Sequence, residues 1–244
     1  MMTDLMLNKH NKYKHMKNIA IIIVVFFGSL SLSGQDLNTF IEASDSFFKK
    51  HVSNGKVAYS EIKKDPTELN QVLKLAEALS VSKTNASNYQ AFWINAYNLS
   101  VIKGLVNHYP TKSPLDHDGF FDKTKYNLGG KKITLNDIEH KLLRAQFNDA
   151  RIHFVLVCGA IGCPPLINKA YKPSILESQL QKQAELALNG NYFIKVNTKK
   201  KKVEGSELLK WYKDDFTMNG MTEIEYINKY RTEKIPKNLS LIHI

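Results

Sequence analysis

The chain has 244 residues, of which 43% are hydrophobic and 23% charged, and its formal net charge is +11. This composition fits one globular domain with a sizeable core. The sequence has no low-complexity segment and no repeat of the solenoid type, which excludes repeat architectures. The basic charge includes a run of four lysines at 199–202, which is typical of a solvated loop. No nucleic-acid-binding motif accompanies this charge, so we expect no nucleic acid partner.

The first 34 residues have the three parts of an export signal. Four lysines between Lys9 and Lys17 precede an apolar run from Ile19 to Phe27, and small residues follow as far as Gly34. We therefore expect a signal peptide over 1–34, a single domain over 35–244 and a periplasmic or secreted protein. The alternative is an uncleaved anchor, which is the only membrane contact that we expect. Met16 is an alternative start.

The first half of the expected domain is rich in helices, which we place at 37–51, 66–79 and 87–109. Apolar residues of the third helix form one broad face, and Asn95 and Asn98 lie within that face. Two amides in an apolar face need hydrogen-bond partners. They either hold the backbone of a neighbouring loop or position groups at a site, so both are candidate substrate-binding residues.

A long connection over 110–130 leads to a short strand at 131–133 and a helix at 135–146 that Thr134 caps. Glu139 lies in the middle of the apolar side of this helix, where a carboxylate needs a partner, a shifted pKa, or both. His140 and Arg144 lie one turn apart on an adjoining flank. We consider Glu139 and His140 candidate catalytic residues and Arg144 a candidate substrate-binding residue.

The segment Arg151–Leu166 is the expected functional centre. Residues 151–157 are apolar and of strand length, which favours a buried strand. Cys158 then lies at the end of that strand, and Cys163 lies in the glycine-rich loop beyond it. His153, within the strand, is a candidate base or a satisfied core histidine.

Beyond this centre we expect a helix at 174–188 and a hairpin of two strands at 191–197 and 201–203. Further helices begin at Ser206 and cover 222–232, and the region of Pro236 is expected to be a tail. Helices followed by a small, mostly antiparallel sheet predict the α+β class.

Several separated segments resemble the domain of unknown function 547 (DUF547) family, and together they extend over about 37–235. The resemblance maps the family's Ile-Glu-His and Cys-Gly elements onto Ile138–His140 and Cys158–Gly159. It implies an exported bacterial protein but no particular activity. The segments are Ala91–Asn98, Thr134–Arg144, Ile152–Gly159, Cys163–Leu166 and Trp211–Phe216.

Three kinds of chemistry fit these residues. Cys158 or Cys163 could be a nucleophile with His140 or His153 as base, in a hydrolase or acyltransferase of papain-like or transglutaminase-like fold that acts on a small molecule or peptide. The same cysteines with His140 and Glu139 could bind zinc, although their spacing is unusual for a zinc site. A Cys158–Cys163 disulfide could instead pin a loop in a non-catalytic binding or scaffold domain. In the first and third cases we expect no cofactor.

Overall fold

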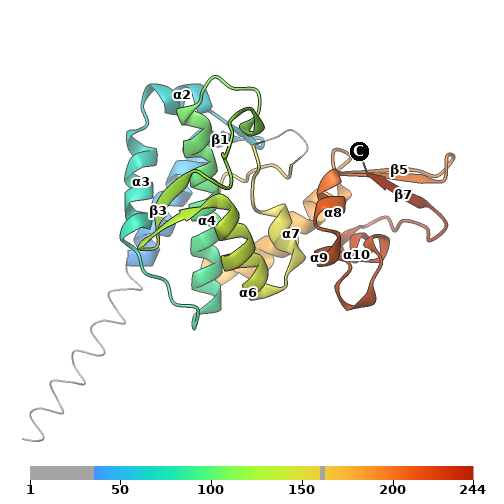
Figure 1. Ribbon diagram of the computed structural model, residues 1–244. Coiled ribbons are helices and arrows are strands. Elements are labelled where there is room, and N and C mark those ends of the chain that lie inside the picture. The colour runs from blue at the N-terminus through green and yellow to red at the C-terminus, as the bar shows by residue number, and fades with distance from the viewer. Residues whose placement is uncertain (1–35, 160–162, 244) are drawn as a thin grey trace, which may run out of the picture.

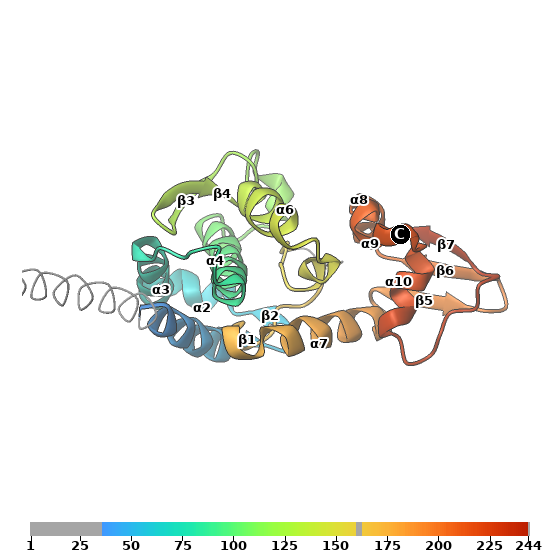
Figure 2. The ribbon, with the colours of Figure 1, turned by 90° about the horizontal axis from the view of Figure 1, so that it is seen from below.

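Two lobes joined by one long helix make up the part of the chain that the computed structural model describes, which is residues 36–159 and 163–243 (Figures 1 and 2). The N-terminal lobe comprises 36–175, and the C-terminal lobe comprises 190–243. Helix α7 (Leu176–Asn189) runs under both lobes and connects them. The predicted export signal lies outside the described residues, as does the middle of the cysteine loop, 160–162.

The N-terminal lobe begins with helical residues 36–51 and continues through a two-stranded ladder and several helices. Four short 3-10 or π-helical segments also belong to its described residues. In chain order, the elements are β1 (Val52–Ser53), β2 (Lys56–Val57), α2 (Tyr59–Lys64), α3 (Thr67–Ala78), α4 (Ala86–Asn107), η1 (Pro114–Asp116), β3 (Lys125–Leu128), β4 (Lys131–Thr134), α5 (Leu135–Asp137), η2 (Ile138–Arg144), α6 (Ala145–Phe147), η3 (Ala150–Phe154) and η4 (Pro173–Ile175).

Helix α4 is the centre of this lobe and is buried on all sides. Every residue from Tyr89 to Ile102 is buried, including the polar ones, so the single apolar face that the sequence predicted is too narrow a description. A helix enclosed on all sides belongs to the interior of a fold. The close packing leaves no room for a side chain at Gly104, where a Cβ atom would lie 2.7 Å from the Phe120 ring. Helix α4 therefore provides a rigid floor for the elements packed around it.

The C-terminal lobe contains a three-stranded sheet with helices packed on it. Strand β5 pairs with β6 in antiparallel register, so that Ile194 lies opposite Gly205, and β7 adds to β6 in parallel. The four lysines at 199–202 are exposed at the turn between β5 and β6. The elements are β5 (Ile194–Asn197), β6 (Lys202–Gly205), α8 (Glu207–Trp211), α9 (Lys213–Phe216), η5 (Met218–Gly220), α10 (Glu223–Tyr230) and β7 (Ser240–His243).

Each lobe has its own hydrophobic core, and α7 contributes to both. Its first turns bury Leu176 and Leu180 in the core around α4. Its last turns bury Ala184 and Leu188 in the core of the C-terminal lobe, which also contains Phe216. One helix thus links the two cores and fixes the separation of the lobes.

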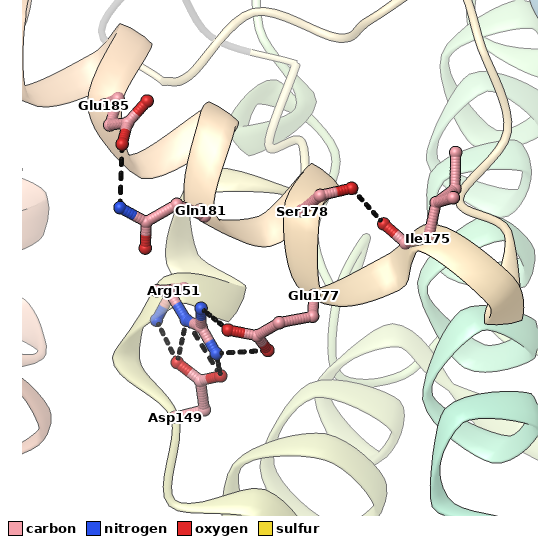
Figure 3. Close-up of polar contacts among 7 residues, drawn as sticks. All are labelled: Asp149, Arg151, Ile175, Glu177, Ser178, Gln181 and Glu185. Carbon is pink, nitrogen blue, oxygen red and sulfur yellow. Dashed lines mark hydrogen bonds and ion pairs between the residues drawn. The ribbon is translucent and has the colours of Figure 1, made fainter.

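A polar cluster around Arg151 also attaches α7 to the N-terminal lobe (Figure 3). Arg151 is the first residue of the expected functional centre. The Arg151 guanidinium donates to both oxygens of Asp149 and to both oxygens of Glu177 on α7, at 2.6–3.1 Å. Bidentate arginine–carboxylate pairs fix geometry as well as adding energy. The cluster therefore holds η3 against α7.

The predicted α+β class is confirmed, with small and mostly antiparallel sheets. The predicted helices, the strand at 131–133 and the hairpin of β5 and β6 are all present within a few residues of their expected bounds. Three local expectations were wrong. Residues 150–154 form the 3-10 helix η3 and no strand, the connection at 110–130 contains η1 and β3, and the expected tail contains β7.

The error at 151–157 has a physical cause. Apolar residues from η3 are buried in both cores, because Ile152 packs in the first and Phe154 in the second. Burial on both sides gives the same continuous apolar pattern as a buried strand. The backbone, however, is held by side chains, since Asp149 accepts from the Arg151 N–H and Asn98 binds residues 155 and 157.

No helix among the described residues combines the length and the apolar character that a bilayer crossing requires.

Candidate functional site

A pocket of about 440 Å³ lies between the two lobes. The N-terminal lobe supplies one wall, which comes from α4, η1, the helical segment 135–147 and the two cysteines. The C-terminal lobe supplies the other wall, which comes from α8 and the residues beside it. The lining is mostly apolar and aromatic, with a few polar groups, and consists of Tyr97, Pro114, Leu115, Phe121, Asn136, Glu139, His140, Cys158, Cys163, Ser206, Glu207, Leu208, Trp211 and Tyr212.

The helical segment that carries Glu139 and His140 has an unusual geometry. It begins as α5, where the Thr134 hydroxyl accepts from the Asp137 N–H as the sequence predicted. It then widens into the π-helix η2 and ends as α6. π-Helical turns are rare and often occur at functional sites. Here the widened turn places Glu139 and His140 on the pocket side.

Glu139 is a buried carboxylate whose hydrogen bonds come from phenols. It is 9% exposed, and the Tyr97 hydroxyl donates to its Oε2 over 3.4 Å. The Tyr212 hydroxyl also donates to Glu139. Burial raises the pKa of both tyrosines, and the neighbouring carboxylate raises it further, so both stay protonated as donors. The prediction that Glu139 needs a partner is therefore confirmed, although the partners are phenols and no cation.

Behind the pocket, a chain of charged and polar groups connects the lobes. Arg144 Nη1 donates to His140 Nδ1 over 2.7 Å, and its Nε and Nη2 donate to the two oxygens of Asp215 over 2.6 and 2.8 Å. His153 Nε2 donates to Asp215 Oδ2 over 2.6 Å. Because arginine can only donate, His140 Nδ1 is an acceptor, so His140 is neutral and carries its proton on Nε2.

Asp215 is the acceptor at the centre of this chain. Burial opposes its ionisation, but the hydrogen bonds and charges of His153 and Arg144 outweigh burial and hold the pKa of Asp215 well below its usual range. Tyr212 packs on the same groups, with its ring stacked on His153 at 3.9 Å between centroids and with the Arg144 guanidinium 4.9 Å from its centroid. The hydrogen-bonded side chains of Arg144, Asp215 and His153 therefore fix the position of Tyr212 in the pocket wall.

This arrangement shows where two of the site residues expected from the sequence lie. His153 is 3% exposed, does not line the pocket and stacks on Tyr212, so it is the satisfied core histidine of the two alternatives. Arg144 does not line the pocket either, because its donors are directed to Asp215 and His140. Both residues position the wall of the pocket rather than contact its contents.

Asn95 and Asn98 are also positioning residues, and neither lines the pocket. The Asn95 amide donates to the Tyr171 carbonyl and accepts from the Tyr171 N–H, at 2.8 and 2.9 Å. The Asn98 amide donates to the Val155 carbonyl and accepts from the Val157 N–H, at 2.9 and 3.0 Å. Both side chains are fully buried. These hydrogen bonds bear out the alternative that both amides bind the backbone of neighbouring segments.

Cys158 and Cys163 form a disulfide, and their Cα atoms are 6.1 Å apart. In this oxidised form neither sulfur is a thiolate, so the expected nucleophile is not present. Sulfur ligands for zinc are likewise not present, and among the described residues no group of three or more His, Cys, Asp or Glu side chains is placed to hold a metal ion. Both disulfide-bonded cysteines line the pocket.

The sequence reasoning missed several residues of this site, namely Tyr97, Phe121, Trp211, Tyr212 and Asp215. A signal for four of them was present. Tyr97 lies in the Ala91–Asn98 segment, and Trp211, Tyr212 and Asp215 lie in the Trp211–Phe216 segment, both of which were used only to identify a resemblance. Nothing in the sequence pointed to Phe121.

The fold and site thus define a two-lobed α+β domain with a pocket between the lobes that a disulfide helps to line. Comparison with protein families gives a match over residues 81–186 to the family described as "Protein of unknown function, DUF547". The match over these residues bears out the resemblance predicted from the sequence. The matched segment includes the pocket wall of the N-terminal lobe and the disulfide, and it ends within α7. Comparisons with curated proteins and with solved structures found no match.

Proposed function

We propose that this chain is an exported binding domain that holds a small molecule between its two lobes. The observation that carries the proposal is the pocket of about 440 Å³, which lies in the size range of small-molecule sites. Such sites are mostly apolar and have a few placed polar groups, and the aromatic lining with Glu139 and His140 has this character.

Several features support a preformed pocket. Asn98 holds the backbone just before Cys158, and the disulfide closes the loop beyond it. On the opposite wall, the Arg144–Asp215–His153 chain fixes Tyr212. A site that is ordered before binding loses less conformational entropy when a ligand enters.

A thermal-shift screen of a small-molecule library against the mature chain tests this proposal. Asn136→Trp should fill the pocket and abolish the shifts caused by genuine ligands, while Thr198→Trp places the same bulk on the exposed hairpin turn and should leave them unchanged. Shifts that persist in both variants would show that the ligands bind elsewhere and would contradict the proposal.

The export part of the proposal has its own test. The basic and apolar pattern of residues 1–34 supports it. Mature protein recovered from the periplasm or medium should begin near Gln35. Protein that stays in the cytoplasm with its first residues intact would overturn the assignment.

The second candidate is a thiol-dependent hydrolase or acyltransferase of papain-like or transglutaminase-like arrangement that is active when reduced. One observation favours it, because both cysteines line the same pocket as Glu139 and His140. Thiol titration of the native protein and profiling with a thiol-reactive probe test it, with Cys158→Ala and Cys163→Ala compared. Fast labelling of one cysteine that depends on His140 supports this candidate, whereas a fully oxidised pair in the exported protein excludes it.

A further inference from the structure

The charge of the pocket is opposite to that of the chain. The chain has a formal net charge of +11, yet the described residues that line the pocket include Glu139 and Glu207 and no lysine or arginine. His140 adds no positive charge, because the hydrogen bond from Arg144 keeps its Nδ1 unprotonated. A low-dielectric cleft lined by one sign of charge attracts ligands of the other sign.

Glu139 has unused capacity to accept hydrogen bonds. A carboxylate offers about four acceptor positions. The Tyr97 and Tyr212 hydroxyls occupy part of that capacity. Among the described residues, Glu139 forms no ion pair, and Arg144 on the same helix is committed to Asp215. Arg144 attracts Glu139 electrostatically but forms no ion pair with it, so this buried carboxylate can still pair with a cation that enters the pocket.

The aromatic residues around Glu139 suit the same kind of ligand. Tyr97, Trp211 and Tyr212 line the same pocket as Glu139, and Trp211 is 64% exposed. Aromatic faces attract ammonium groups, and the attraction is stronger where water is excluded. The remaining wall, with Phe121 and Leu208, is apolar and would contact the uncharged part of such a molecule.

We propose that this pocket binds an organic cation, a protonated amine or quaternary ammonium carried on an apolar body, with the cationic head against the Glu139 carboxylate. This inference rests on the proposed function, because it names the chemical class of the small molecule. The exposed Glu207 lies at the pocket as a second, weaker source of attraction.

A matched set of probes tests the charge directly. The mature, oxidised protein is titrated with 4-phenylbutylamine, 4-phenylbutan-1-ol and 4-phenylbutanoate, which share one apolar body and differ in the head group. The readout is calorimetry and tryptophan fluorescence. The amine should bind about tenfold or more tightly than the alcohol, because it alone brings a positive charge to the carboxylate as well as a hydrogen bond, and the carboxylate probe should bind most weakly.

Variants locate the effect. Glu139→Gln should weaken amine binding by about tenfold to a hundredfold and leave alcohol binding within about twofold. Glu207→Gln should weaken amine binding by less than about threefold, because an exposed charge is screened. Glu77→Gln removes an exposed carboxylate that does not line the pocket and should change nothing.

The outcomes separate the two proposals. Equal binding of amine and alcohol would overturn the cation inference and leave the pocket as a small-molecule site. Tighter binding of the carboxylate probe, or no binding of the amine, would also overturn the inference, and the library screen with Asn136→Trp then decides the proposed function by itself. The comparison of head groups on the unmodified chain holds even if Glu139→Gln fails to fold.

Discussion

Asn98 and Glu139 are both polar residues set into apolar helix faces, but the structure uses them differently. Asn98 is fully buried. The NH2 of its amide donates to one backbone carbonyl before Cys158, and the amide oxygen accepts from one backbone N–H there. Glu139 lines a pocket and receives hydrogen bonds from two phenols. A buried polar group with all its partners inside the fold contributes to stability, whereas one with unused capacity facing a cavity is available to a ligand.

Asn98→Ala should have the largest effect on stability. It leaves the Val155 carbonyl and the Val157 N–H buried without partners, so the free energy of unfolding should fall by about 2–4 kcal/mol. Urea unfolding measures this change. The control is Asn70→Ala on the exposed surface of α3, which should cost under about 0.5 kcal/mol. A similar loss of unfolding free energy in both variants would mean that the backbone hydrogen bonds of Asn98 add nothing to stability.

Asp215→Asn should have the next largest effect, because it removes the carboxylate that Arg144 and His153 share. We expect a loss of about 2 kcal/mol, less than for a fully buried pair because Asp215 keeps 20% of its side-chain exposure. Since the folded state lowers the pKa of Asp215, its contribution is complete above the ordinary value of 3.8 and is lost as pH falls below it.

The acid limb of the stability curve checks this assignment. Unfolding free energy followed from pH 6 down to pH 2 should fall less steeply in Asp215→Asn than in the unmodified chain. Asp118→Asn, which alters a carboxylate that is 89% exposed, is the matched control. Identical acid limbs for all three proteins would refute the role of Asp215.

Loss of the disulfide should have a smaller effect. Cys158 and Cys163 are five positions apart, and closing so short a loop stabilises the fold by about 2 kcal/mol or less in the chain-entropy account. The double variant Cys158→Ser/Cys163→Ser should unfold at correspondingly lower urea concentration and should bind the amine probe more weakly, because the end of the pocket is no longer fixed. Unchanged binding would show that Asn98 alone suffices to order this wall.

Glu139→Gln should have the smallest effect on stability. The glutamine carbonyl oxygen still accepts from a phenol, and the substitution removes a buried charge that forms no ion pair among the described residues, so the change should be under about 1 kcal/mol in either direction. Urea unfolding of this variant beside Asn98→Ala gives the sharpest form of the comparison. If Glu139→Gln were as destabilising as Asn98→Ala, Glu139 would be a structural residue like Asn98.

Local patterns predicted much of the fold. The 3.6-residue periodicity located the helices, the cap at Thr134 located the start of the 135–147 segment, and the turn chemistry located the hairpin of β5 and β6. The prediction failed at 150–157, where burial between two cores gives the same apolar run as a buried strand. It also failed for β7, whose pairing partner β6 is nearly forty residues earlier in the chain.

The sequence by itself determined which residues are chemically unusual: an acid at 139 within an apolar face, amides at 95 and 98, and two cysteines close enough to join. Only the tertiary structure decided their roles. The spacing along the chain cannot say that Tyr212 and Asp215 of the C-terminal lobe meet Glu139, Arg144 and His153 of the N-terminal lobe, because that meeting depends on how α7 joins the two cores. The pocket lies between the lobes. The residues of its two walls are therefore separated in the sequence by α7, the helix that joins the lobes.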